Sequence, residues 1–109
     1  MENLWSDADA RDAVARYAEQ GVGEDLALRV YSSRLLGCEP RLVLHGGGNT
    51  SVKTTASDVL GEPVDVLCVK GSGWDMGDIE PAGLPATPPW TTSRPTAFFR
   101  LFYKNCRIR

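Results

Sequence analysis

Apolar residues recur at helical spacing near the start of the chain. The residues that share one helical face are Ala10, Val14, Tyr17 and Ala18. Ser6 can cap the first turn by accepting a backbone N–H, and the acids that begin at Asp7 suit the positive end of a helix. Gly21 and Gly23 end the pattern. We therefore predict a helix that begins at Asp7, with one face covering another part of the molecule.

A second helical pattern extends from Glu24 to Leu36. Leu26, Val30 and Leu36 lie toward one side of such a helix. Gly37 follows at the position where a glycine commonly closes a helix. The sequence thus predicts two consecutive amphipathic helices.

Past Pro40 the pattern changes to short apolar runs, which predict strands. These runs are "RLVLH" (41–45), "TSVKTT" (50–55) and "VDVLCVK" (64–70). The first and the third are followed by glycine-rich segments: the first glycine loop, "GGGNTS" (46–51), and the second glycine loop, "GSG" (71–73). Both loops lie at one end of a sheet if those two strands run in the same direction, which the sequence does not decide. Prolines from Pro81 onward exclude a long helix there.

Two helices followed by strands in a chain of 109 residues indicate one small α/β domain. Hydrophobic residues make up 42 %, so the core is modest. No apolar run approaches the roughly 18 residues of a membrane helix. The acidic, polar N-terminus does not resemble an export signal, and the odd number of cysteines predicts reduced thiols. We therefore expect a cytoplasmic protein without a membrane partner.

Charge is spread unevenly along the chain. The first 89 residues hold 7 basic and 14 acidic side chains, a balance of -7, whereas residues 90–109 hold five basic side chains and no acid. The pI near 5.3 argues against general nucleic-acid binding. A basic end on an acidic chain indicates a partner-binding arm or a change of sequence origin.

The two glycine loops carry the candidate chemistry. Glycines let backbone N–H groups approach a ligand closely, and the neighbouring side chains offer further donors. Those side chains are Asn49, Thr50, Ser51 and Ser72, with Lys53 and Lys70 as nearby cations. Such loops suit a bound phosphate, and they equally suit tight turns that bind nothing.

Better-known motifs fit poorly. "GSGWDMG" has the spacing G-x-G-x-x-x-G, and Pro81 and Pro85 oppose the long helix that a dinucleotide fingerprint needs. No Walker sequence is present. His45 is the single histidine and cannot form a multi-histidine zinc site, so a hydrogen-bonded turn residue is the plainer interpretation. Nothing around Lys70 favours a Schiff-base lysine over a surface amine.

At this point the residues carry a family resemblance. "LALRVYSSRLLGCEPRLVLHGGGNTSVK" and "VLCVKGSGWDMGDIEPAGLPA" resemble the class II aldolase/adducin family, most closely the aldolase part of bifunctional rhamnulose-1-phosphate aldolase/alcohol dehydrogenases. The resemblance extends from about Leu4 to Ala86. It rests on two motifs taken together, G-N-x-S and K-G-S-G-W-D. It implies the N-terminal part of an α/β/α sandwich, two helices plus a small sheet.

The resemblance also implies a function. Such lyases of carbohydrate metabolism cleave a ketose 1-phosphate, for example rhamnulose 1-phosphate, into dihydroxyacetone phosphate and an aldehyde such as lactaldehyde. A zinc ion held by histidines stabilises the enediolate, and a glutamate moves the proton. The substrate phosphate lies among positions that here are Gly48, Asn49, Ser51, Ser72 and Gly73. Members of the family form homo-oligomers.

The resemblance stops after Ala86. The catalytic glutamate and zinc-binding histidines of the family have no counterpart in residues 87–109, so we expect no catalytic or metal residues in this chain. Residues 87–109 are predicted to form a divergent basic tail beside a partial domain of residues 1–86, as a truncated gene or a reading-frame change would produce. A loosely ordered end is one interpretation. The apolar, basic "AFFRLFYK" could instead lie on a membrane surface or cover a sheet edge.

Three functions remain open on the sequence. The first is a sugar-phosphate aldolase fragment that keeps the phosphate loops and is inactive alone. The second is a non-enzymatic interaction module of the adducin kind. The third is a simple binder of phosphate sugars.

Overall fold

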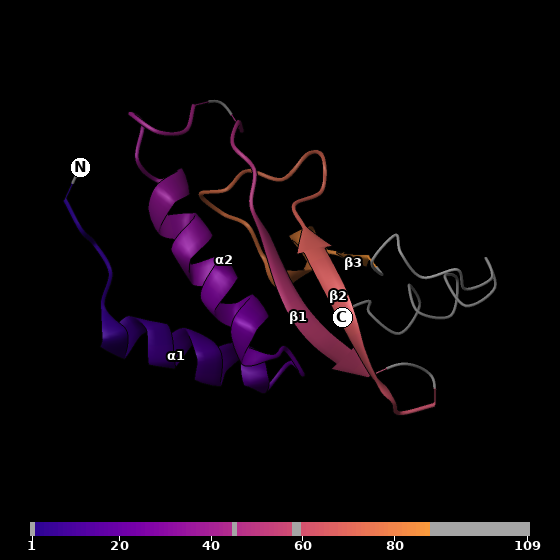
Figure 1. Ribbon diagram of the computed structural model, residues 1–109. Coiled ribbons are helices and arrows are strands. Elements are labelled where there is room, and N and C mark those ends of the chain that lie inside the picture. Colours follow the sequence, from indigo (N-terminus) through magenta and orange to yellow (C-terminus); the bar gives the residue numbers. More distant parts are fainter. Residues whose placement is uncertain (1, 45, 58–59, 88–109) are drawn as a thin grey trace.

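The computed structural model describes residues 2–44, 46–57 and 60–87. Within them the chain forms α1 (Asp7–Ala18), α2 (Glu24–Gly37), β1 (Ser51–Ser57), β2 (Pro63–Val69), the 3-10 turn η1 (Pro81–Gly83) and β3 (Ala86–Thr87). Figure 1 shows the two helices on one side of a small sheet. The α/β prediction of two helices plus a small sheet is confirmed.

The start of α1 matches its sequence signal. Ser6 is the N-cap, and its hydroxyl accepts the backbone N–H of Asp9 at 3.3 Å. Asp7 and Asp9 occupy the first turn, where their charges favour the helix dipole. Gly21 follows with a φ of 77°, a left-handed conformation in which glycine turns the chain toward α2.

Helix α2 also forms where it was predicted, and Gly37 lies at its end. The helix ends at Gly37 with Cys38 as the cap, and Cys38 is right-handed. A Cβ placed on Gly37 would lie 2.3 Å from the backbone nitrogen of Gly77. The helix thus ends at the glycine as expected, and the position requires glycine because two backbones approach closely there.

The strand predicted at 41–45 does not form over its described residues, 41–44. Leu42 and Val43 donate their N–H groups to the carbonyl of Glu39, at 2.9 and 3.1 Å, so the segment continues as a turn after α2. The side chains of Leu42 and Leu44 are 56 % and 63 % exposed. An apolar run without a neighbouring strand to pair with gains no burial from extension, which is why the pattern alone misled.

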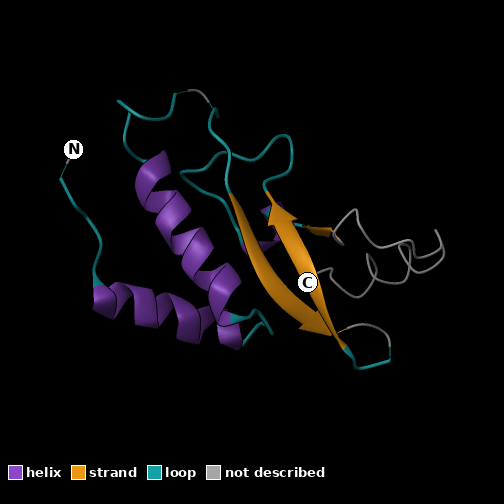
Figure 2. Cartoon of the chain, in the orientation of Figure 1, coloured by secondary structure: helices purple, strands orange, loops and turns teal. Residues whose placement is uncertain are grey.

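The other two predicted strands form an antiparallel pair, with β3 on the far side of β2 in the order β1-β2-β3. Ser51, the first residue of β1, pairs with Val69, the last residue of β2. The start of β1 and the end of β2 therefore lie at one end of the sheet. Figure 2 shows both connecting loops at this end, opposite the turn that joins the two strands.

One face of the sheet packs on the helices. Side chains alternate along β1 between exposed and half-buried, as expected for a strand with one covered face. The buried cluster comprises Tyr17, Val22, Leu26, Ala27, Val30, Val66, Cys68, Ile79, Leu84 and Ala86. It joins both helices to β2, β3 and the segment around η1, so the helices and the sheet share one core.

The predicted boundary at 86/87 falls inside β3. Thr87 pairs with Leu67, and its hydroxyl donates to the carbonyl of Leu67 at 2.9 Å. The sheet thus includes the first residue assigned to the tail. The rest of the predicted tail, residues 88–109, lies outside the described residues.

Candidate phosphate site

The two glycine loops meet at one end of the sheet. The first loop leads into β1 and the second follows β2, and the backbone N–H of Lys70 donates to the carbonyl of Thr50 at 3.0 Å. Their proximity is a consequence of the antiparallel pairing of β1 with β2. The sequence alone did not decide whether the predicted strands at 41–45 and 64–70 run in the same direction, and the described residues 41–44 form no strand.

Within the first loop, side chains alternate between exposed and half-buried positions. Asn49 and Ser51 are exposed, whereas Thr50 between them is half-buried. The side-chain oxygen of Asn49 accepts the backbone N–H of Thr50 at 2.9 Å, which fixes the amide next to the strand. The pattern G-N-x-S therefore presents its asparagine and serine to solvent and turns the intervening residue inward.

Two glycines of the candidate site have backbones that favour glycine. Gly48 has a φ of 79° and Gly73 a φ of 87°. A Cβ on Gly48 would also lie 2.6 Å from the sulfur of Met76, a buried side chain of the segment that follows the second loop. Gly48 thus lets the first loop approach the segment that follows the second loop. Ser72 and Gly73 are exposed, so their polar groups are accessible.

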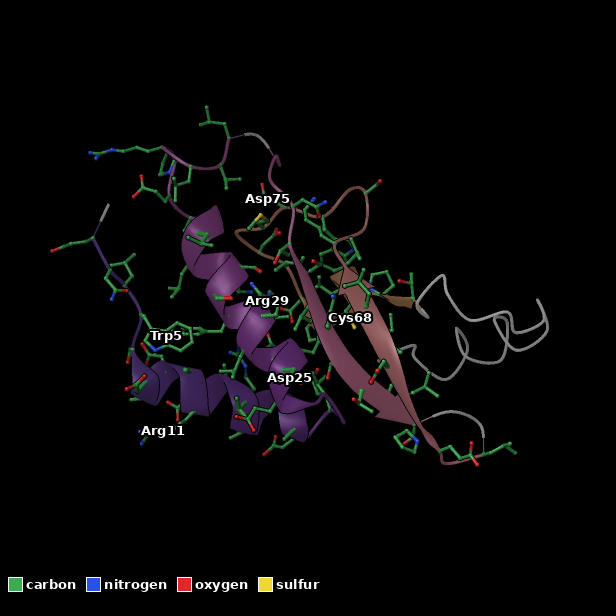
Figure 3. All side chains as sticks on the ribbon, viewed as in Figure 1. Trp5, Arg11, Asp25, Arg29, Cys68 and Asp75 are labelled. Carbon is green, nitrogen blue, oxygen red and sulfur yellow. The ribbon has the colours of Figure 1, made fainter. Side chains whose placement is uncertain are left out.

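The electrostatic character of this end is mixed. Lys70 follows β2 directly, while Asp75 lies close to the first loop, with one carboxylate oxygen 4.0 Å from where a Cβ on Gly46 would stand. Figure 3 shows Asp75 at this end of the sheet. Its other oxygen accepts the N–H of Gly77 at 2.8 Å. An anion here would thus rely on backbone N–H groups and neutral side-chain donors more than on net charge.

A polar cluster on the helix side was not foreseen from the sequence. Glu80 forms an ion pair with Arg34 and accepts the hydroxyl of Tyr17 at 3.1 Å, while Arg34 Nε donates to the carbonyl of Ile79 at 2.7 Å. Burial raises the pKa of the Tyr17 phenol, Arg34 opposes this shift, and Glu80 adds to it. The cluster joins α1, α2 and the segment before η1. Glu80 lies 46 residues from Arg34 and 63 residues from Tyr17 in the sequence, so no local pattern could indicate the cluster.

A cavity of about 310 Å³ lies beside this cluster, between α1 and α2. Its lining includes Arg16, Tyr17, Arg34 and Gly77, with Leu4 at one side. Among the residues predicted to contact phosphate, none lines this cavity. The cavity and the loop site are therefore separate features of the described chain.

The described residues contain no group of three or more His, Cys, Asp or Glu side chains that could hold a metal ion. His45 lies outside them. The described residues therefore do not fit the zinc site that the family resemblance implies, and they support no metal-dependent step. Among the described helices, none is both long enough and apolar enough to cross a membrane.

Comparisons with known proteins agree with the aldolase resemblance. No model of a known protein family matches the chain. The structure is similar to an N-terminal class II aldolase domain of a conserved protein from Thermoplasma acidophilum, with a TM-score of 0.56 and 41 % sequence identity over 81 % of this chain and 35 % of that one. A Bacillus subtilis (strain 168) protein, the uncharacterized oxidoreductase YuxG, is 45 % identical over 51 residues, which are 47 % of this chain and 7 % of YuxG.

The similarity to a solved aldolase domain supports the class II aldolase family. The chain spans about a third of that domain's chain and a small fraction of the Bacillus relative. The name of the Bacillus protein does not identify a substrate.

Proposed function

We propose that this chain supplies the phosphate-binding part of a class II aldolase-type domain. The observation that carries the proposal is the meeting of the two glycine loops at one end of the β1–β2 pair, joined by the Lys70–Thr50 backbone hydrogen bond. The aldolase domain from Thermoplasma acidophilum supports the family context.

In this proposal Asn49, Ser51 and Ser72 donate to the phosphate oxygens. Gly48 and Gly73 allow the backbone N–H groups to converge, since each adopts a positive φ that other residues rarely take. The side chains of Asn49, Ser51 and Ser72 are exposed and therefore accessible to a ligand. The ligand class is a sugar 1-phosphate or the dihydroxyacetone phosphate produced from it, with rhamnulose 1-phosphate as the specific candidate.

The catalytic groups of the reaction are not assigned to this chain. In the family the zinc ion polarises the ketone when it is bound, and the described residues offer no cluster to hold it. The residues of the two loops bind and orient the phosphate end of the substrate. We propose that carbon–carbon bond cleavage requires groups that the described residues do not supply.

Calorimetric titration of the chain with dihydroxyacetone phosphate tests the proposal, with unphosphorylated dihydroxyacetone as the matched ligand. Asn49→Ala and Ser72→Ala should each weaken phosphate binding roughly tenfold to 150-fold, because a hydrogen bond to a charged group typically contributes roughly 1.5–3 kcal/mol. Ser57→Ala removes an exposed hydroxyl at the opposite end of β1 and should change nothing.

Equal binding of the phosphorylated and unphosphorylated compounds would contradict the proposal. It would favour the second candidate function, a non-enzymatic module of the adducin kind. The observation that keeps this alternative is that the described residues hold no group of three or more His, Cys, Asp or Glu side chains that could bind a metal ion.

A further inference from the structure

A buried serine on α2, Ser33, forms a hydrogen bond with a residue of the first glycine loop. Ser33 is 1 % exposed, and its hydroxyl donates to the hydroxyl of Thr50 at 2.9 Å. Thr50 stands between Asn49 and Ser51, the two side chains proposed to hold the phosphate. Because successive side chains of an extended segment point to opposite sides, anchoring Thr50 inward directs its two neighbours outward.

The residue that Ser33 holds is also bonded to the chain next to the second loop. Thr50 accepts the N–H of Lys70 through its carbonyl, and Lys70 directly precedes the second glycine loop. One residue thus bonds to α2 through its side chain and to the end of β2 through its backbone. A shift of Thr50 therefore changes the position of the first loop relative to the second.

Helix α2 also forms a side-chain hydrogen bond with β1, farther from the two glycine loops. The hydroxyl of Thr54 donates to a carboxylate oxygen of Asp25 at 2.9 Å. Figure 3 shows Asp25 near the start of α2, far along the helix from the loops. Two threonine hydroxyls thus form hydrogen bonds with α2, Thr50 in the first loop and Thr54 in β1, and only Thr50 adjoins the candidate site.

We propose that Ser33 is a positioning residue for phosphate binding, acting through Thr50. The inference rests on the proposed function of the loops and assigns a role to two residues that contact no ligand themselves. The hydroxyl pair sets the backbone of residues 49–51 so that Asn49 and Ser51 point outward at the end of the sheet where the two loops meet.

The test compares Ser33→Ala, Thr50→Val, the double variant and Thr54→Val. Ser33→Ala and Thr50→Val should each weaken dihydroxyacetone phosphate binding roughly threefold to tenfold, which is the effect of one neutral hydrogen bond. The double variant should be no weaker than the worse single variant, because both changes remove the same interaction. Thr50→Ser keeps the hydroxyl and should bind like the unmodified chain. Thr54→Val should also bind normally.

Amide spectra without ligand provide an independent readout. Ser33→Ala should move the resonances of Asn49, Ser51 and Lys70, whereas Thr54→Val should leave them in place. Valine has nearly the shape of threonine. Thr50→Val therefore tests the same hydrogen bond if Ser33→Ala folds poorly.

Unmoved loop resonances in both hydroxyl-removing variants, additive losses of affinity, or an equal effect of Thr54→Val would overturn the inference. If the unmodified chain binds no dihydroxyacetone phosphate, the proposed function fails, and the amide spectra alone decide whether Ser33 positions the loop.

Discussion

At the residue scale, glycine is needed at several positions for different physical reasons. Gly48 adopts a positive φ and leaves space for Met76, while Gly37 permits contact between the end of α2 and the backbone of Gly77. The sequence showed the glycines but not these reasons. A helix-closing glycine and a glycine at a close backbone approach look identical in a single sequence, because their difference lies in what packs against them.

Gly37→Ala should destabilise the fold. The added Cβ would lie 2.3 Å from Gly77 N and 2.4 Å from the Met76 carbonyl carbon, both backbone atoms that cannot rotate away. Overpacking of this kind typically costs about 1–3 kcal/mol. Gly23→Ser is the control, since a Cβ there meets nothing within 4 Å and serine is a good N-cap for α2. Urea unfolding of the two variants measures this difference in stability. Equal unfolding midpoints would refute the close-contact explanation.

Tyr17 makes the stability sensitive to alkaline pH. Burial raises the pKa of its phenol in the folded chain above the ordinary value of 10.0, so folding favours the protonated form. The stabilisation is complete below about pH 10 and is lost as the pH rises through the folded-state pKa. Tyr17→Phe removes this titration. Its free energy of unfolding should fall less steeply above about pH 10 than that of the unmodified chain, and parallel pH profiles would exclude Tyr17 as the cause.

At the element scale, local signals predicted both helices and the β1 and β2 strands. Ser6 and the first-turn acids located the start of α1, and β-branched residues located β2. The segment 41–45 was wrongly predicted as a strand because a short apolar run carries no information about a pairing partner. The same limitation applies to the two glycine loops: their chemistry was visible, but their meeting depends on the antiparallel register.

Leu42→Ser and Leu44→Ser should leave the stability almost unchanged. Both side chains are more than half exposed, and surface substitutions usually change the free energy of unfolding by less than about 0.5 kcal/mol. Val66→Ala, at a β2 position that is 3 % exposed, should instead destabilise by about 2 kcal/mol. Thermal melts of the three variants measure this contrast. A large loss for either leucine variant would show that the segment packs against something in solution.

At the scale of the whole molecule, one core holds both helices behind the sheet and leaves the two glycine loops together at its end. The resemblance to class II aldolases indicated the phosphate chemistry, and the solved aldolase domain supports the family. The polar cluster of Tyr17, Arg34 and Glu80 escaped sequence reasoning because it joins three elements that are distant in the chain.

The 109-residue chain should not cleave a ketose 1-phosphate when zinc is supplied. It contains one histidine, and a catalytic zinc site generally takes three protein ligands. An assay for dihydroxyacetone phosphate released from rhamnulose 1-phosphate checks this expectation. Zinc-dependent release that a chelator abolishes would contradict it.

The measurement that tests the central claim most directly is an amide chemical-shift titration with dihydroxyacetone phosphate. If the two loops form one phosphate site, resonances of residues 46–51 and 71–73 should shift together with a single saturation curve, while those of α1 stay in place. Shifts confined to one loop, shifts around the cavity between α1 and α2, or no shifts at all would contradict the account.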